Sequence, residues 1–264
     1  MAGWFYGYPS YPYQAFLPAP NQTMQKTLPV HEIFHAFQGE GVHMGRSALF
    51  IRTFGCPVKC PWCDSAGTWH HKYVPANIAR MSREDLEHEI ARARDEIEFV
   101  VLTGGEPCIH ADMLLVLQEV CEANNLPLHI ETCGAFPIAN NQLHPTTWVT
   151  VSPKWDKPPV LAMVRRADEL KIIIEDPGSL GRWERHFKDE LGIELSNASQ
   201  DVWLHPEWSR REDAELLGSI TNAVKRHGMR YRAGWQLHKL YQCDSLDGRS
   251  RPLVPLGGNM NLGF

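Results

Sequence analysis

Short apolar runs alternate along the chain with longer segments in which apolar residues recur every three or four positions. The apolar runs predict β-strands at residues 48–54, 98–102, 128–131, 148–151, 169–175, 201–205 and 230–238. The periodic segments predict helices at 82–94, 111–124, 179–191 and 211–228. Ser82, with Asp85 three residues on, marks the start of the first helix. Strands that alternate with amphipathic helices indicate an α/β fold with parallel pairing.

The two ends of the chain depart from this pattern. Residues 1–28 are dense in Tyr and Pro, a poor composition for a helix, and glycines and prolines interrupt residues 244–264. We expect an aromatic, Pro-rich N-terminal arm at 1–28, a single core domain at 29–243 and an irregular C-terminal tail at 244–264. A length of 264 residues suits one large domain.

Polar and glycine-rich residues follow several of the predicted strands. "TGGEP" follows residues 98–102, "ETCG" follows "LHI", "SPK" follows "WVTV", and "HPEW" follows "VWL". Each taken singly fits an ordinary turn between a strand and a helix. Because ligands bind at the carboxyl ends of parallel strands, their common placement predicts one shared site.

Three cysteines, Cys56, Cys60 and Cys63, lie in a C-x3-C-x2-C pattern directly after the first predicted strand. A structural zinc site completed by a distant ligand is one interpretation, since zinc favours four closed ligands. The alternative is a [4Fe–4S] cluster held by three thiolates, which leaves one iron open for chemistry. The other cysteines are scattered singly at positions 108, 121, 133 and 243.

Composition limits the classes of partner and the cellular compartment that we expect for the protein. The formal net charge of −5 argues against a nucleic-acid partner, which would require a basic surface. No apolar run is long enough to cross a bilayer, and the N-terminus lacks the basic and apolar regions of a secretory signal. We therefore expect a cytoplasmic protein with no membrane contact, whose seven cysteines are thiols or metal ligands.

The cysteine spacing, with Trp62 before the last cysteine, resembles the radical S-adenosylmethionine superfamily. "TGGEP" at 103–107 is a second signature of that superfamily. The resemblance implies that S-adenosylmethionine binds the open iron and is cleaved, by one electron, to methionine and a 5′-deoxyadenosyl radical that abstracts a substrate hydrogen. Glu106 would accept a hydrogen bond from the methionine ammonium group.

Further motifs resemble one family within it, the 7-carboxy-7-deazaguanine synthases. They are "EIFHAFQGEG" (32–41), "FIRTFGCPVKCPWCDSAGTW" (50–69), "VLTGGEPCIH" (101–110), "IETCG" (130–134), "WVTVSPK" (148–154) and "HK" (238–239). The family resemblance implies a lyase that converts 6-carboxy-5,6,7,8-tetrahydropterin to 7-carboxy-7-deazaguanine with loss of ammonia, a precursor step for queuosine. It also implies a single-domain partial (β/α) barrel, Mg2+, regenerated S-adenosylmethionine, an external electron donor and a homodimer.

The resemblance also assigns residues. Cys56, Cys60 and Cys63 would hold the cluster, and Ser65 would bind Mg2+ where the family usually has Thr. The residues expected at the S-adenosylmethionine site are Trp62, Asp64, Gly105, Glu106, Ser152, Pro153, Lys154 and His205. The residues expected at the substrate are Phe37, Gln38, Gly39, Glu40, Arg52, Thr103 and His238.

Simpler roles stay open for several of these residues. Gln38 and Glu40 suit loop caps, Arg52 a surface ion pair, Lys154 a solvated cation and His238 a core position. The chain also has "LHPEW" (204–208) where the family often has Gln-Pro, which weakens the assignment of His205. Rival functions are a glycyl-radical-activating enzyme, a related radical enzyme with another substrate, and a zinc-stabilised binding module.

Overall fold

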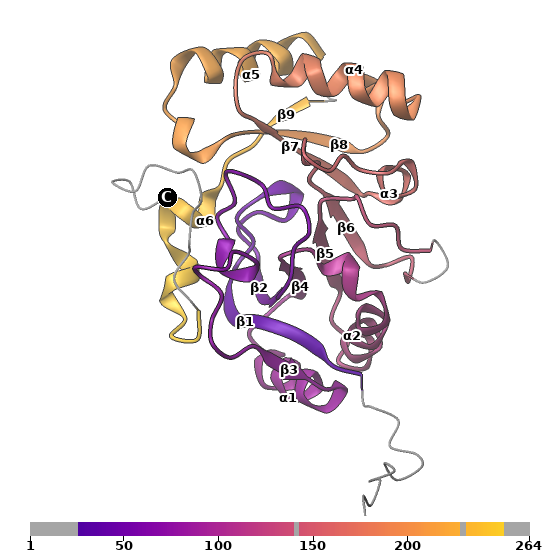
Figure 1. The fold of residues 1–264 in the computed structure, drawn as a ribbon, viewed down its shortest axis with the longest axis vertical. Coiled ribbons are helices and arrows are strands. Elements are labelled where there is room, and N and C mark those ends of the chain that lie inside the picture. The colour runs from indigo at the N-terminus through magenta and orange to yellow at the C-terminus, as the bar shows by residue number, and fades with distance from the viewer. Residues whose placement is uncertain (1–25, 140–142, 228–230, 251–264) are drawn as a thin grey trace, which may run out of the picture.

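A curved, open sheet of nine strands forms the body of the protein in a computed structural model, which describes residues 26–139, 143–227 and 231–250. The strand order is β3-β1-β2-β4-β5-β6-β7-β8-β9. Strands β2 to β9 run parallel to one another, while β1 pairs antiparallel with both β2 and β3. The sheet does not close, so the molecule is a partial barrel, as the family resemblance implies (Figure 1).

The nine strands are short, as parallel strands with helical crossovers usually are. They are β1 (Leu28–Phe37), β2 (Ser47–Thr53), β3 (Ala79–Met81), β4 (Phe99–Gly104), β5 (Leu128–Thr132), β6 (Trp148–Val151), β7 (Glu169–Ile174), β8 (Asp201–Pro206) and β9 (Tyr231–Ala233).

Helices cover the outer side of the curved sheet (Figure 1). They are α1 (Arg83–Ala93), α2 (Ala111–Ala123), α3 (Leu161–Arg166), α4 (Ser179–Leu191), α5 (Ala214–His227) and α6 (Leu237–Tyr241). Ser82 and Asp85 form the expected capping box at α1. No described helix has both the length and the apolar character that crossing a membrane would require.

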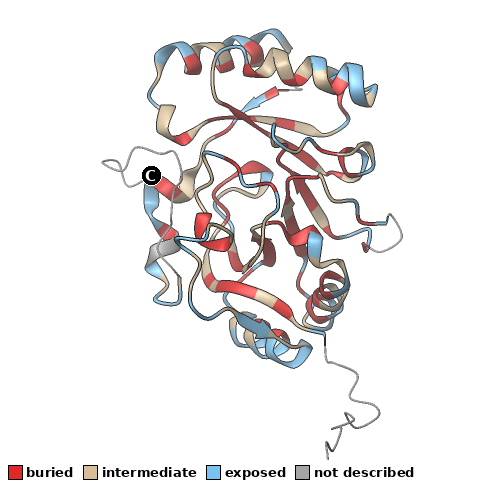
Figure 2. Cartoon of the chain, in the orientation of Figure 1, coloured by how far each residue is buried: buried red, intermediate tan, exposed pale blue. Residues whose placement is uncertain are grey.

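Side chains alternate between the two faces of the sheet, and this alternation creates both a core and a chamber. Val100 and Leu102 of β4 join the large apolar core, whereas Thr103 lines the cavity inside the barrel. In β7, Leu170 and Ile172 likewise enter the core, and Lys171 lines the cavity. Figure 2 shows the buried strands in the centre and the exposed faces of the helices outside. The barrel interior is therefore polar where the site lies.

Four elements differ from the sequence expectation. β1 was not predicted as a strand, because buried His31 and Glu32 interrupt its apolar pattern. β3 and α3 are too short for a periodic signal, at three and six residues. The strand expected at 230–238 is correct only for Tyr231–Ala233, since the chain then leaves the sheet and forms α6.

Residues 234–241, which we call the seam segment, cross the gap between the two ends of the curved sheet. The Gly234 amide donates to the Leu204 carbonyl of β8 at 2.9 Å, and the Leu237 amide donates to the Gly39 carbonyl, just after β1, at 3.0 Å. The chain continues past β1 through a 3-10 turn at Cys243–Leu246 (Figure 1). The seam segment thus links the last parallel strand to the first strand of the barrel.

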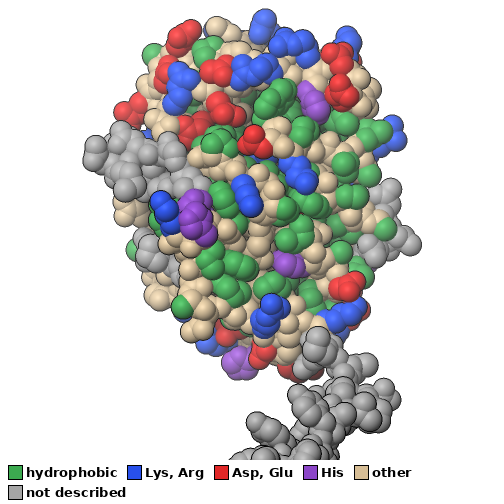
Figure 3. Space-filling model, viewed as in Figure 1, with side chains coloured by type: hydrophobic (Ala, Val, Ile, Leu, Met, Phe, Trp, Pro, Cys, Tyr) green, Lys and Arg blue, Asp and Glu red, His purple; other side chains and the backbone are tan. Residues whose placement is uncertain are grey.

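The surface carries mixed charge. On the face shown in Figure 3, hydrophobic side chains gather over the centre, and acidic and basic side chains lie together over α4 and α5 at one end. Trp155 and Ile109 are among the large apolar side chains that the protein exposes, at 50% and 39%.

Candidate active site

A cavity of about 190 Å3 lies inside the barrel at the carboxyl ends of the parallel strands. Most residues that the sequence analysis singled out line it. They are Phe37, Gln38, Gly39, Glu40, Arg52, Cys56, Cys60, Trp62, Cys63, Asp64, Ser65, Thr103, Gly105, Glu106, Ser152, Lys154 and His238. Residues from distant segments therefore share one site, as the placement of polar residues after the strands predicts.

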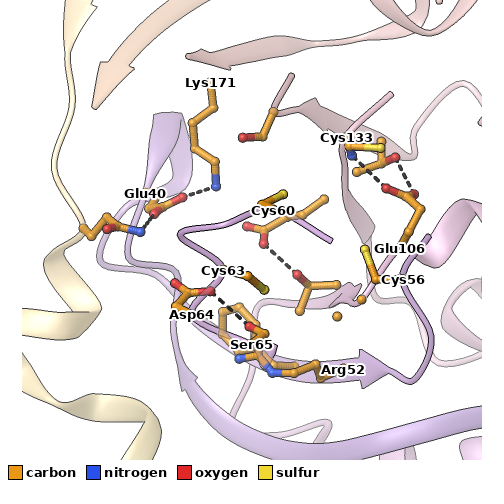
Figure 4. Close-up of a pocket in the computed structure, with 18 of the residues that line it drawn as sticks. Glu40, Arg52, Cys56, Cys60, Cys63, Asp64, Ser65, Glu106, Cys133 and Lys171 are labelled. Carbon is orange, nitrogen blue, oxygen red and sulfur yellow. Dashed lines mark hydrogen bonds and ion pairs between the residues drawn. The ribbon is translucent and has the colours of Figure 1, made fainter. Parts of the chain in front are cut away.

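The three cysteines lie on the loop after β2, around one space (Figure 4). The loop uses left-handed backbone at Gly55 and at Lys59, with φ of 99° and 60°, which turns the chain sharply between the thiols. Burial raises the pKa of Cys60 to about 12 and that of Cys63 to about 11. Burial therefore favours the neutral thiols, and a bound metal would supply the positive charge that favours their thiolates.

The same thiols fit an iron–sulfur cluster better than a single ion. Among the described residues, no three His, Cys, Asp or Glu side chains converge as one metal ion requires. A cluster takes one thiolate at each of several irons and so needs ligands that surround a wider space. The Trp69 indole N–H also donates to Cys63 Sγ at 3.4 Å, and such donors stabilise cluster thiolates.

The "TGGEP" segment packs directly against the cysteine loop. A Cβ at Gly104, where φ is 134°, would lie 2.2 Å from the Thr53 backbone nitrogen. A Cβ at Gly105 would lie 2.1 Å from the Gly55 carbonyl oxygen. Both positions therefore require glycine, and this close approach brings Glu106 to the cavity beside Cys56 (Figure 4).

Glu106 is a buried carboxylate held by fixed donors. It accepts hydrogen bonds from the Thr132 hydroxyl at 2.6 Å, from the Cys133 amide at 2.9 Å and from the Cys108 amide at 3.0 Å. Its exposure is only 1%. A carboxylate so restrained is prepared to bind a cationic group that enters the cavity.

The opposite wall carries a network of polar side chains. Gln38 Nε2 donates to Glu131 Oε1 at 2.9 Å, and the Thr103 hydroxyl donates to Glu131 Oε2 at 3.0 Å. Gln38 Oε1 in turn accepts from the Glu40 amide at 3.1 Å. Neither Gln38 nor Glu40 is a simple loop cap, because both side chains line the cavity.

Glu40 forms a buried ion pair with Lys171, and Gln236 of the seam segment donates to Glu40 at 2.8 Å (Figure 4). Burial opposes the charge of Glu40, but the Lys171 cation outweighs it and holds the Glu40 pKa well below its usual range. Burial likewise lowers the Lys171 pKa, but Glu40 outweighs it and keeps that pKa above its ordinary value. The negative charge of Glu40 and the positive charge of Lys171 therefore compensate each other within this part of the cavity wall.

Arg52 lies at the base of the cavity in a mostly buried ion pair, not a surface one. Its Nε donates to Glu32 at 2.6 Å, and its exposed fraction is 11%. Another guanidinium nitrogen donates to Ser65 Oγ at 3.0 Å, and Ser65 donates to Asp64 at 3.1 Å. Burial opposes the charge of Asp64, but Lys239, at 2.9 Å, and Arg52 together outweigh it and lower the Asp64 pKa well below its usual range.

Lys154 extends from the end of β6 toward the cysteine loop. Its ammonium donates to the Ser152 carbonyl and hydroxyl oxygens, both at 2.6 Å, and lies 5.4 Å from the centre of the Trp62 ring. Burial lowers the pKa of Lys154. A second cavity of about 150 Å3 adjoins the first and shares Cys60, Trp62 and Lys154 with it.

Two of the predicted residues lie outside the lining of the main cavity. Pro153 does not line it, and His205 is fully buried behind it. The His205 ring lies against Gly234, where a Cβ would come within 2.2 Å of Nε2. His205 therefore supports the seam segment, while His238 faces the cavity and packs on Gly39.

Sequence reasoning missed several lining residues, among them Glu131, Cys133, Lys171 and Gln236. A signal was present for two of them. Glu131 and Lys171 are charged residues inside strands, at positions that alternate with apolar core residues. Such a charge indicates an inward-facing polar position in a barrel.

The comparisons with known proteins agree with this geometry. Residues 50–175 match the family model described as the radical SAM superfamily. The 7-carboxy-7-deazaguanine synthase of Synechocystis is 39% identical over 222 residues, which covers 83% of this chain and 95% of that protein. The enzyme of the same name from Escherichia coli K12 is 34% identical over 226 residues, covering 80% of this chain and 96% of its own.

One solved structure is similar over most of both molecules. The crystal structure of QueE from Escherichia coli superposes with a TM-score of 0.66 at 30% sequence identity. The match covers 80% of this chain and 95% of that one.

Proposed function

Because the chain belongs to the 7-carboxy-7-deazaguanine synthase family of radical S-adenosylmethionine enzymes, we propose that it converts 6-carboxy-5,6,7,8-tetrahydropterin to 7-carboxy-7-deazaguanine. The reaction releases ammonia, which makes the enzyme a lyase of 7-deazaguanine biosynthesis. The observation that carries the proposal is that three cluster-type thiols and a polar chamber line the same cavity. The product then serves as a precursor for queuosine or a related 7-deazaguanine.

Cys56, Cys60 and Cys63 would hold a [4Fe–4S] cluster beside bound S-adenosylmethionine. When bound, these two groups supply a carbon-centred radical that removes one hydrogen atom from the substrate. Glu106 would accept hydrogen bonds from the cationic amino end of the cofactor, and Ser152 and Lys154 would bind its polar edge. Trp62 and Asp64 also line the cavity.

The polar wall suits a carboxylated pterin. The Arg52 guanidinium faces the cavity base and would pair with the substrate carboxylate, since a planar fork matches a carboxylate. Gln38, Thr103 and Glu131 offer donors and acceptors for the nitrogen-rich edge of a pterin ring. Phe37 and His238 would close the chamber around the ring.

Ser65 and Asp64 would bind Mg2+ together with substrate oxygens and water. Their side-chain oxygens lie 3.1 Å apart, and both are the hard ligands that Mg2+ prefers. One or two protein ligands suffice, because Mg2+ retains several waters.

The remaining proposals concern the cellular compartment, the electron donor and the oligomeric state. All seven cysteines are free thiols, which suits the reducing cytoplasm where we place the protein. An external one-electron donor would reduce the cluster, and the family resemblance implies a homodimer. Light scattering of the purified protein would test the dimer directly.

The decisive experiment is an anaerobic assay of the reconstituted protein. The protein is loaded with iron and sulfide, reduced, and given S-adenosylmethionine, Mg2+ and 6-carboxytetrahydropterin. We expect mass spectrometry to detect 7-carboxy-7-deazaguanine. Cofactor cleavage without this product would support a related radical enzyme with another substrate. A colourless protein that binds zinc and yields neither product would overturn the enzyme assignment.

A further inference from the structure

A fourth cysteine lines the cavity that holds the three cluster thiols. Cys133 follows β5, is 6% exposed, and belongs to the same small apolar cluster as Val58 and Cys60. Cys56 and Cys63 pack against this cluster (Figure 4). Cys133 is far from the others in sequence, and the fold brings its side chain to the same cavity.

Cys133 also shares a feature with the cluster thiols. The Ala135 amide donates to Cys133 Sγ at 3.4 Å, just as Trp69 donates to Cys63 Sγ. Backbone amides of the cysteine loop donate to Cys56. N–H donors of this kind stabilise a sulfur that carries negative charge in a metal site. Cys121 in α2, a buried thiol outside the cavity, receives no such bond among the described contacts.

The neighbours of Cys133 place it at the cofactor end of the cavity. Its backbone amide donates at 2.9 Å to Glu106, the carboxylate proposed above to receive the amino group of S-adenosylmethionine. The Lys154 cation acts on both Cys133 and Cys60. Cys133 therefore lies beside the carboxylate that would receive the amino group of the cofactor.

Building on the proposed function, we propose that Cys133 ligates the fourth iron of the cluster while S-adenosylmethionine is absent and leaves when it binds. As the iron–sulfur bond forms, the Cys133 proton passes to Glu106, whose carboxylate accepts a hydrogen bond from the Cys133 backbone amide. On exchange, the Cys133 thiolate leaves with the proton that the incoming ammonium group gives up. Glu106 then returns its proton to solvent, and no electron is transferred.

A Cys133 ligand that is exchanged for S-adenosylmethionine would protect the cluster of the resting enzyme against loss of iron. An iron without a protein ligand is the one most easily lost from a three-thiolate cluster on oxidation, and this loss gives a three-iron cluster. A fourth thiolate retains that iron until the cofactor takes its place. The protection therefore matters only when S-adenosylmethionine is absent.

The test measures iron loss in the full-length, reconstituted protein. Wild type, Cys133→Ala and Cys133→Ser are oxidised briefly with ferricyanide, and electron paramagnetic resonance quantifies the three-iron signal. Without S-adenosylmethionine we expect several-fold more three-iron cluster in both variants than in wild type. With S-adenosylmethionine added first, we expect the three proteins to be alike, because the cofactor then holds the iron in each.

Two matched thiol variants separate ligation from indirect effects. Cys108→Ala removes another thiol that contacts Glu106 but does not line the cavity, and Cys121→Ala removes a remote one. Both should behave as wild type. Equal signals in wild type and the Cys133 variants would overturn the proposal, as would an equally large signal in Cys108→Ala. Absence of any four-iron cluster in wild type would instead contradict the proposed function.

Discussion

Single residues that face the cavity are held by partners that lie behind them. Arg52 is fixed by buried Glu32, and Glu106 is fixed by Thr132 and two backbone amides. Such restraint lowers the cost of ordering the site when a ligand binds. The effect of a substitution therefore depends on whether it removes the side chain that faces the cavity or the partner that holds this side chain in place.

Arg52→Lys keeps the positive charge but loses the planar fork. A charged hydrogen bond contributes about 1.5–3 kcal/mol, so we expect KM for 6-carboxytetrahydropterin to rise roughly ten- to hundredfold. S-adenosylmethionine affinity should change little. Steady-state kinetics and cofactor titration measure the two quantities.

The matched control is Arg46→Lys, on an exposed ion pair with Glu98 outside the cavity. Arg46→Lys should leave both the KM for 6-carboxytetrahydropterin and the affinity for S-adenosylmethionine unchanged. An unaltered KM in Arg52→Lys would show that Arg52 only supports the fold.

Ser65→Ala removes one of the two oxygens proposed to bind Mg2+. We expect the Mg2+ concentration for half-maximal turnover to rise several-fold, because Asp64 alone would remain as the protein ligand. A magnesium titration of turnover measures the shift. Ser65→Thr keeps the hydroxyl and should restore the wild-type curve. Identical titrations for Ser65→Ala and wild type would remove Ser65 from the metal site.

At the scale of elements, the end of β4 depends on its close approach to the end of β2. Gly104→Ala places a methyl group on the Thr53 backbone in a left-handed conformation. We expect a loss of roughly 3 kcal/mol in the free energy of unfolding, which lowers Tm by about 10 °C. Thermal denaturation of the metal-free protein measures it.

Gly218→Ala in α5 is the opposite case, because a Cβ there meets nothing within 4 Å. It should stabilise the protein by about 0.5–1 kcal/mol. If both alanine variants melted alike, the close approach at Gly104 would not be a structural requirement.

Elements with a regular apolar pattern could be predicted from the sequence, and the others could not. α4 has the predicted bounds, Ser179–Leu191, because its apolar residues recur with helical spacing. The sequence pattern does not predict β1 as a strand, because His31 and Glu32 are polar residues that the fold nevertheless buries. The cysteine loop and "TGGEP" could be found as local motifs, whereas Gln236 joins the site only because the curvature of the sheet brings the seam segment to Glu40.

At the scale of the whole molecule, buried histidines link stability to pH. Burial lowers the pKa of His205 from 6.5 to about 4, against the opposing charge of Glu40. Lys171 and His238 also face His205 and lower its pKa. Between these two values the unfolded chain binds the proton and the folded chain does not, so stability falls as pH drops from 6.5 to 4.

His205→Gln should remove about 3 kcal/mol of this pH dependence. Urea denaturation at several pH values measures the slope. Some slope will remain, because burial also lowers the pKa of His129 to about 3. Parallel curves for His205→Gln and wild type would contradict the prediction.

The seam segment also sets the order in which the cavity wall is completed during synthesis. Gln236 contacts Glu40 across 196 positions of sequence, and Lys239 pairs with Asp64 across a similar span. A chain that leaves the ribosome N-terminus first can form the hairpin of β1 and β2 early. The wall that Gln236 and His238 complete can form only after β9 has emerged. The substrate chamber is therefore finished late in synthesis, after nearly all of the sheet has emerged.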